Sequence, residues 1–264
     1  MRLPQRIVCL TEETTETIYA LGESDRIVGI SGYTVRPSIA RKEKPKVSSF
    51  ISANLDKIID LKPDLVIGFS DVQAEIASNL IKRGIQVLFF NQRSIDEIFQ
   101  MILILGSIVN KYKLAVDLID NYREKINKSK KRKLQYPPKV YFEEWDDPMI
   151  SGIGWVSELI EIAGGVDIFS KLRLKKSAKE RFVKSKMVID ENPDIIIASW
   201  CGKKVNKERI ISREGWNKIN AIKSNRIYEI KSSIILQPGP ACLTDGLNKL
   251  IEIIDGYNND KRDS

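Results

Sequence analysis

Carboxylates, tryptophans and glycines are concentrated in the stretch YFEEWDDPMISGIGWVSELIEIAGG, residues 141–165. Glu143, Glu144 and the Asp146-Asp147 pair are the residue types of a general acid–base pair or of a site for a hard metal ion. The glycines suit a nucleotide-binding loop, or the wall of a pocket for a large, flat ligand. The local sequence pattern distinguishes among these four kinds of site: catalytic, metal-binding, nucleotide-binding and pocket wall.

Strand geometry disfavours the catalytic and metal interpretations. Successive side chains of a β-strand point to opposite faces, so Glu143 and Glu144 cannot act on one atom. Asp146-Asp147-Pro148 has the composition of a turn. Gly152-Ile153-Gly154 precedes a helical pattern but lacks the GxGxxG spacing of a dinucleotide loop. The stretch is therefore predicted to be a pocket wall, with no catalytic residue and no metal ligand.

The amino-acid composition excludes several classes of active site. The chain of 264 residues contains no histidine, which removes the Ser-His-Asp triad, the Cys-His pair and histidine ligands for zinc or haem. The three cysteines, Cys9, Cys201 and Cys242, form no CxxC motif, so neither a disulfide framework nor a zinc ribbon is indicated. No catalytic cofactor is expected, and a bound metal would arrive inside a chelate or use other ligands.

Much of the net charge of +8 lies in KINKSKKRK (residues 125–133) and KLRLKKSAKERFVKSK (residues 171–186). An excess of positive charge suits an acidic ligand, a nucleic acid or an anionic surface. The first segment contains no aromatic residue and adjoins two prolines, so a solvated helix end and linker is favoured over a nucleic-acid patch. The chain is expected to be a monomer that binds no nucleic acid.

The N-terminus enters a strand pattern directly and lacks the layout of a signal peptide. The most apolar run, residues 98–109, is too short to span a bilayer. The sequence as written therefore predicts a cytoplasmic protein, or an extracytoplasmic, membrane-associated one if a leader has been removed.

An internal repeat divides the chain into two similar halves. LDKIIDLKPDLVIGFS (residues 55–70) resembles SKMVIDENPDIIIASW (residues 185–200), since each is a short helical pattern that ends at Pro-Asp before an apolar strand. Upstream, Gly22 and Gly164 each follow a helical pattern at the left-handed position. Alternating strands and helices predict a mostly parallel sheet with flanking helices in each half.

A long helix is predicted between the halves. Ser94 and Glu97 form a capping box, and apolar residues then recur at helical spacing to about Ile126. The predicted fold class is α/β, with two lobes, each a mostly parallel sheet flanked by helices, joined by one long rigid helix. The predicted domains are an N-terminal lobe (1–93), the linking helix (94–130) and a C-terminal lobe (131–264).

These motifs resemble the class III solute-binding proteins of ABC importers, which capture iron-siderophores, haem and cobalamin. The likeness extends over nearly the whole chain and includes RIVCLTEETTETIYALGESDRIVGISGYTVRP (residues 6–37) and KVSSFISANLDKIIDLKPDLVIG (residues 46–68). The stretch at 141–165, with QPGPACLTDGLNKLIEI (residues 237–253), looks closest to the cobalamin-binding subgroup. The resemblance implies a binding protein and not an enzyme.

In open α/β sheets ligands bind beyond the carboxyl ends of the strands, and in two lobes these ends should face a common cleft. The expected function is non-catalytic binding of cobalamin or a related corrinoid in this inter-lobe cleft, for delivery to an ABC permease or for salvage. Aromatic residues recur at the predicted strand ends. The expected ligand-binding residues are Tyr33, Phe50, Phe69, Trp145, Trp155, Trp200 and Ser233.

Two alternatives remain open. A ferric siderophore or another metal chelate is the second candidate within the same fold, and Arg36 and Arg93 could bind its anionic groups. An enzyme that uses the carboxylates of Glu143–Asp147 is the third. The family resemblance also implies one exposed acidic residue per lobe that pairs with transporter arginines, for which Glu75 and Glu208 are the candidates.

Overall fold

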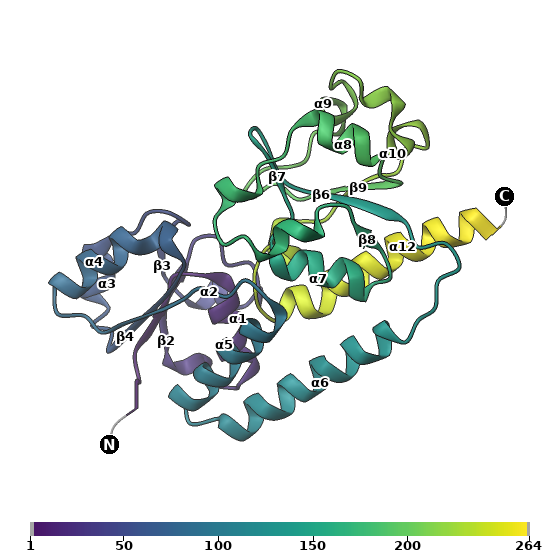
Figure 1. Cartoon of the computed structure of the whole chain (residues 1–264). Helices are drawn as coiled ribbons and strands as arrows, with labels where there is room; N and C mark the ends of the chain where they lie inside the picture. Colours follow the sequence, from purple (N-terminus) through teal and green to yellow (C-terminus); the bar gives the residue numbers. More distant parts are fainter. Residues whose placement is uncertain (1–2, 263–264) are drawn as a thin grey trace. The chain divides into compact units, whose positions relative to one another are not determined.

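The structure, a computed structural model, describes residues 3–262 and contains two compact units (Figure 1). Unit 1 is the chain up to Asn121 together with Gln237–Ala241, and unit 2 is Tyr122–Leu236 together with the chain from Cys242 onward. Each unit is a mostly parallel sheet flanked by helices, which confirms the predicted α/β class. None of the helices in the described part is both long and apolar enough to cross a bilayer.

Unit 1 contains a five-stranded sheet in which all the strand pairs are parallel. The strand order β3-β2-β1-β4-β5 places a topological switch point between β1 and β4. Burial on both faces explains apolar strand sequences such as LVIGF in β4. The strands are β1 (Ile7–Cys9), β2 (Ile27–Ser31), β3 (Lys46–Ser48), β4 (Leu65–Phe69) and β5 (Val87–Phe90).

Helices cover both faces of this sheet (Figure 1). On one face, Ile58 of α3 and Leu80 of α4 pack against Val8 and Val66 of the sheet. On the other, α1 packs against α5. The helices are α1 (Glu12–Ala20), α2 (Ala40–Glu43), α3 (Leu55–Asp60), α4 (Ala74–Lys82) and α5 (Ile95–Ile108), with short turns η1 (Ser24–Arg26) and η2 (Asp71–Gln73).

The sheet of unit 2 has the order β10-β9-β6-β7, and β8 also pairs with β6. Only β7 runs antiparallel among these strands. The long strand β6 therefore forms the centre of the sheet and pairs with three others. The strands are β6 (Lys139–Asp146), β7 (Met149–Ser151), β8 (Val166–Asp167), β9 (Ile195–Ala198) and β10 (Ile227–Glu229).

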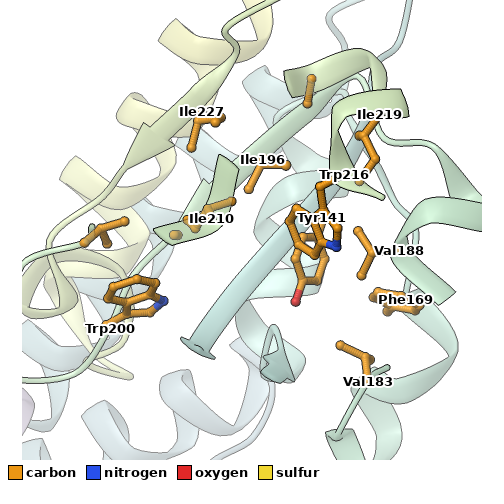
Figure 2. Packing of buried hydrophobic residues seen from close by; sticks show 13 residues of the cluster. Tyr141, Phe169, Val183, Val188, Ile196, Trp200, Ile210, Trp216, Ile219 and Ile227 are labelled. Atoms are coloured by element: carbon orange, nitrogen blue, oxygen red, sulfur yellow. The ribbon is translucent and has the colours of Figure 1, made fainter. Parts of the chain in front are cut away.

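Aromatic packing forms the core on one face of the unit 2 sheet (Figure 2). The Tyr141 ring meets Phe169 edge-on at 5.7 Å between centroids and Trp216 at 6.1 Å. The helices are α6 (Tyr112–Lys130), which begins in unit 1, α7 (Gly154–Ile162), α8 (Ser185–Glu191), α9 (Lys207–Ile211), α10 (Asn220–Lys223), α11 (Ser232–Ile235) and α12 (Leu247–Arg262). The short turns are η3 (Ser170–Leu174), η4 (Ala178–Arg181), η5 (Trp216–Lys218) and the π-helical η6 (Cys242–Gly246).

The Pro-Asp repeat has the same role in both units. In unit 1 the Asp64 carboxylate accepts a hydrogen bond from the backbone N–H of Arg6, just before β1, at 2.9 Å. In unit 2 the Asp194 carboxylate accepts one from the backbone N–H of Lys139, the first residue of β6, at 3.0 Å. Each aspartate thus links the beginning of its own strand to the beginning of the central neighbouring strand.

Residues in the left-handed backbone conformation follow the repeated helices. Gly22 and Gly164 follow α1 and α7 with φ of 73° and 94°, as predicted. Lys62 and Asn192, which precede the two repeat prolines, have nearly equal φ of 48° and 47°. The two halves therefore share backbone conformation as well as sequence pattern.

The prediction of one uninterrupted linking helix is wrong, because α5 ends at Ile108 and α6 begins at Tyr112. Asn110 between them has a left-handed φ of 61°, a conformation that asparagine tolerates better than most residues. The two helices then pack closely, and a Cβ atom on Gly106 would lie 2.4 Å from the Ala115 Cβ. The capping box of Ser94 and Glu97 is confirmed.

This close packing predicts that Gly106→Ala destabilises unit 1. The added methyl group would overlap Ala115, and overpacking of this kind costs about 1–3 kcal/mol. Gly256→Ala in α12 is the matched control, because its Cβ meets no atom within 4 Å and the helix should gain about 0.5–1 kcal/mol. Urea unfolding followed by far-UV circular dichroism measures both changes. Equal effects of the two variants would contradict the packing interpretation.

Candidate functional site

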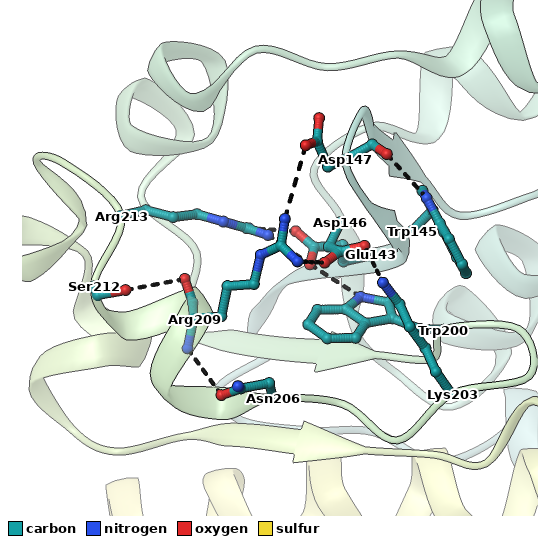
Figure 3. A network of polar contacts seen from close by, with 10 residues as sticks. All are labelled: Glu143, Trp145, Asp146, Asp147, Trp200, Lys203, Asn206, Arg209, Ser212 and Arg213. Carbon is teal, nitrogen blue, oxygen red and sulfur yellow. Dashed lines mark hydrogen bonds and ion pairs between the residues drawn. The ribbon is translucent and has the colours of Figure 1, made fainter.

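The carboxyl end of β6 in unit 2 carries a fully buried carboxylate (Figure 3). The Arg213 guanidinium donates to both Glu143 oxygens, at 2.5 and 3.0 Å. The Trp200 indole N–H donates to the same carboxylate at 3.2 Å, and the Tyr141 hydroxyl does so at 3.1 Å. Burial raises the pKa of Tyr141 well above its ordinary value, so this phenol stays a donor. Glu143 is therefore compensated by three neighbouring side chains.

Glu144 points to the opposite face of β6, as the strand geometry predicts. Its carboxylate forms a bidentate pair with the buried Arg181, at 2.6 and 3.0 Å. The two adjacent glutamates thus have separate arginine partners and do not form one acid–base pair. Among residues 3–262, no group of three or more Cys, Asp or Glu side chains is placed to hold a metal ion.

A second layer of charge lies next to the tryptophans (Figure 3). The Lys203 ammonium is 2.7 Å from an Asp146 oxygen, 4.2 Å from the centre of the Trp145 ring and 4.8 Å from that of Trp200. Arg209 lies 2.9 Å from the other Asp146 oxygen. Burial opposes the ionisation of Asp146, but Lys203 and Arg209 outweigh it and lower the pKa of this carboxyl group.

An open hollow of about 750 Å³ borders this cluster in unit 2. Asp146 and Arg213 line it on the side of the cluster, and Met149, Val183 and Ile189 contribute apolar surface. A volume of this size falls within the range of small-molecule sites.

The carboxyl edge of the unit 1 sheet is held together by Gln73. Its side-chain oxygen accepts from the backbone N–H of Phe69 at 2.9 Å, and its amide donates to the Phe50 carbonyl at 2.8 Å. The Arg93 guanidinium lies 5.0 Å from the centre of the Phe69 ring. Tyr33 lies beyond β2 and is 52% exposed. Three of the predicted aromatic residues therefore lie at this edge.

Arg36, a candidate for anion binding, is paired within unit 1. Its Nε lies 2.9 Å from a Glu16 oxygen, and the backbone N–H of Ala241 donates to the other oxygen at 3.0 Å. Arg93 donates to the Ser70 hydroxyl at 2.9 Å. Both arginines thus have hydrogen-bond partners within unit 1.

The other predicted ligand-binding residues lie in unit 2 and are buried or half-buried. Trp155, at the beginning of α7, is buried and donates its indole N–H to the Ile235 carbonyl at 2.9 Å. Trp200 is also buried and belongs to the aromatic core, whereas Trp145 is half-buried. Ser233 is half-buried in α11. Of the predicted set, the structure brings Trp145 and Trp200 together around Lys203.

Lys203, Arg209 and Arg213 were not predicted from the sequence. Arg209 lies in α9 and Arg213 in the segment that follows it, so their spacing in the sequence gave no clear signal. Their carboxylate partners lie more than fifty residues earlier in the chain, on β6.

Two buried glutamates at the beginning of α1 were also missed. Glu12 and Glu13 are only 2% and 1% exposed, and one oxygen of each has no hydrogen-bond partner among the described residues. Burial raises the pKa of Glu12 to about 8 and that of Glu13 to about 7. The neighbouring Glu16 adds to both shifts, while Arg36 opposes the shift of Glu12.

Comparison with known proteins identifies similar chains. The model of the family described as periplasmic binding protein matches residues 7–234. An uncharacterized ABC transporter substrate-binding lipoprotein of Bacillus subtilis is 27% identical over 266 residues, which cover 95% of this chain and 80% of the relative. A vitamin B12-binding protein of Vibrio parahaemolyticus is 25% identical, over 98% of this chain and 91% of its own.

A solved structure of similar fold is that of a possible iron-binding, periplasmic solute-binding protein from Staphylococcus epidermidis. It superposes with a TM-score of 0.81 at 26% identity, over 96% of this chain and 99% of the other.

The buried glutamates predict a pH-dependent stability. Below about pH 4.5 both carboxyl groups are protonated in the folded and the unfolded chain; between about pH 4.5 and pH 7–8, only the folded chain retains these protons. The unfolding free energy should therefore fall over this window. Glu12→Gln and Glu13→Gln keep the shape but cannot ionise, so each should add about 1–3 kcal/mol at pH 8 and almost nothing at pH 4.5.

Urea unfolding at the two pH values tests this prediction, with the exposed Glu75→Gln as the control in the same unit. A gain that is the same at both pH values, or a gain in the control, would count against buried, protonated carboxyl groups.

Proposed function

The chain belongs to the periplasmic binding protein family, and we propose that it binds cobalamin or a related corrinoid for delivery to an ABC importer. Members of this family are solute-binding proteins and not enzymes, so the role is capture without chemical conversion. The vitamin B12-binding relative, which aligns over almost the whole chain, supports a corrinoid as the ligand.

The observation that carries the proposal is the pair of tryptophans at the carboxyl edge of unit 2. Trp145 lies two residues beyond the buried Glu143 on β6, and Trp200 lies two residues beyond the end of β9. The Lys203 ammonium contacts both rings, and Trp200 is fixed through its indole N–H. The half-buried Trp145 directly precedes Asp146, which lines the open hollow, and a partly exposed indole beside a hollow of this size supports a large, partly apolar macrocycle as the ligand.

Charge pairing favours a neutral, amide-bearing ligand over a strongly anionic one. Arg213 is paired with Glu143, Lys203 with Asp146, and in unit 1 Arg36 is paired with Glu16. An anionic chelate would have to break these ion pairs or bind beside cations that are already neutralised. The amide groups of a corrinoid need only hydrogen-bond partners.

A ferric siderophore or another metal chelate is the second candidate. Lys203 and Arg209 are 40% and 52% exposed at their side chains, so their cationic groups can turn toward an anion. The similarity to the possible iron-binding protein of Staphylococcus epidermidis supports this alternative. An enzyme based on Glu143–Asp147 is disfavoured, because these carboxylates are occupied by arginine and lysine partners.

Docking on the importer is proposed to use Glu75 and Glu208. Both are exposed, and each lies in the first turn of its helix, Glu75 in α4 of unit 1 and Glu208 in α9 of unit 2. Equivalent placement in the two units would present one carboxylate per unit to transporter arginines.

Titration calorimetry with cyanocobalamin tests the ligand. We expect saturable binding with an absorption spectrum of the base-on form, because the chain has no histidine to replace the lower axial base of the cobalt. Trp145→Ala should weaken binding by about tenfold or more, as removal of an aromatic anchor typically costs ~2 kcal/mol. Trp200→Phe, which retains a ring in the core, should weaken it less.

Tyr136→Ala is the matched control, since this exposed aromatic residue precedes β6 at the opposite end of the strand. It should leave the affinity unchanged. Binding of a ferric siderophore with no binding of cobalamin would replace the corrinoid proposal by the second candidate.

Charge reversal tests docking separately from ligand binding. Glu75→Lys and Glu208→Lys should each lower stimulation of the reconstituted importer by about tenfold, the equivalent of ~1.4 kcal/mol, because an attractive pair becomes repulsive. Ligand affinity should not change. Asp60→Lys, an exposed charge reversal at the end of α3, is the control. Normal stimulation by both glutamate variants would exclude these residues from the docking surface.

A further inference from the structure

A strongly basic segment of unit 2, residues 171–186, lies mostly outside the proposed ligand site, since only Val183, Ser185 and Lys186 of this segment line the hollow. It contains eight lysines and arginines and one glutamate, whereas the whole chain has a net charge of only +8. Positive charge is thus concentrated on a small part of the molecule. Concentration of this kind generates a local field that attracts anionic partners.

Two of these eight cations fix the segment to the body of unit 2. Arg181 is buried and bidentate with Glu144 of β6, and Arg173 lies 2.6 Å from Glu161 at the end of α7. Phe182 also forms a β-bridge with Ile150. The segment is therefore an ordered surface. Its other six cations are exposed: Lys171, Lys175, Lys176, Lys179, Lys184 and Lys186.

Leu174 projects from the middle of this charge. Its side chain is 82% exposed, more than that of any other large apolar residue in the described part of the chain. Arg173 and Lys175 are its immediate neighbours in sequence. An exposed apolar side chain among cations is not stabilised by burial within the protein. Side chains of this kind are typical of surfaces that insert into the boundary between lipid headgroups and acyl chains.

A second basic segment meets the first at the same end of α7. Arg132, just after α6, donates to the Ala163 carbonyl at 3.2 Å, two residues beyond the Glu161 that pairs with Arg173. Next to Arg132, four exposed lysines add to the charge: Lys128, Lys130, Lys131 and Lys133. We call these four lysines, the three lysines that flank Arg173 (Lys171, Lys175 and Lys176) and Leu174 the basic corner.

We propose that the basic corner binds the surface of an anionic phospholipid bilayer, with Leu174 inserted among the headgroups. The dispersed lysines can each approach a different headgroup, and together they attract a negatively charged membrane. A single-stranded nucleic acid would instead need aromatic rings for base stacking, and neither residues 125–133 nor residues 171–176 contain one. The proposal does not depend on which ligand the protein binds.

Sedimentation with phospholipid vesicles tests the proposal on the full chain. The protein should bind vesicles that contain phosphatidylglycerol, bind pure phosphatidylcholine vesicles at least tenfold more weakly, and lose binding as salt is raised. Lys171→Glu/Lys175→Glu should weaken binding to the anionic vesicles at least tenfold. Leu174→Ser should weaken it about threefold or more and leave the salt dependence unchanged.

Matched controls come from unit 1. Ile51→Ser removes an apolar side chain that is 70% exposed, and Lys42→Glu/Lys46→Glu reverses two exposed lysines. Both should bind like the unaltered protein, and circular dichroism should show that every variant is folded. Equal binding to both kinds of vesicle, or normal binding by the basic-corner variants, would overturn the proposal. Tighter binding of single-stranded oligothymidine than of anionic vesicles at the same salt would also overturn it.

Discussion

The buried carboxylate of Glu143 is the constraint on which the carboxyl edge of unit 2 depends. A fully buried charge without compensation costs several kcal/mol, so its partners have to be held in place. Arg213 connects the segment after α9 to β6, and the indole N–H of Trp200 connects the loop after β9 to the same atoms. The orientation of an aromatic residue in the proposed site is therefore determined by a polar network beneath it.

The same network explains how an edge with several cations can favour a neutral ligand. The Asp146 and Asp147 carboxylates together offset the charges of Lys203 and Arg209, as Glu143 offsets that of Arg213. The half-buried ring of Trp145 then lies beside internally paired charge. Removing one partner leaves the other buried or half-buried without compensation, so the composition of this edge is hard to change one residue at a time.

Local sequence patterns predicted most of the fold but only part of the site. The Pro-Asp repeat and the glycines after α1 and α7 specify local geometry, so the parallel strands and helix ends could be predicted. The break after α5 was missed because apolar periodicity continues past Asn110. The partners of Glu143 and Asp146 were missed because ion pairs across so many residues leave no local pattern. Glu12 and Glu13 resembled ordinary acidic residues of a first helical turn.

The burial of Glu13 has a cause that only the folded chain reveals. The segment Gln237–Ala241 belongs to unit 1 although it follows α11 of unit 2, and Gly239 approaches the side chain of Glu13 so closely that a Cβ atom would lie 2.6 Å from the Glu13 Cβ. Packing against this segment helps to remove Glu13 from water, and a buried carboxylate needs compensating partners. The Ala241 backbone N–H is meanwhile bound by Glu16. The short segment by which the chain returns to unit 1 therefore packs against Glu13 and is bound by Glu16, which is itself ion-paired with Arg36.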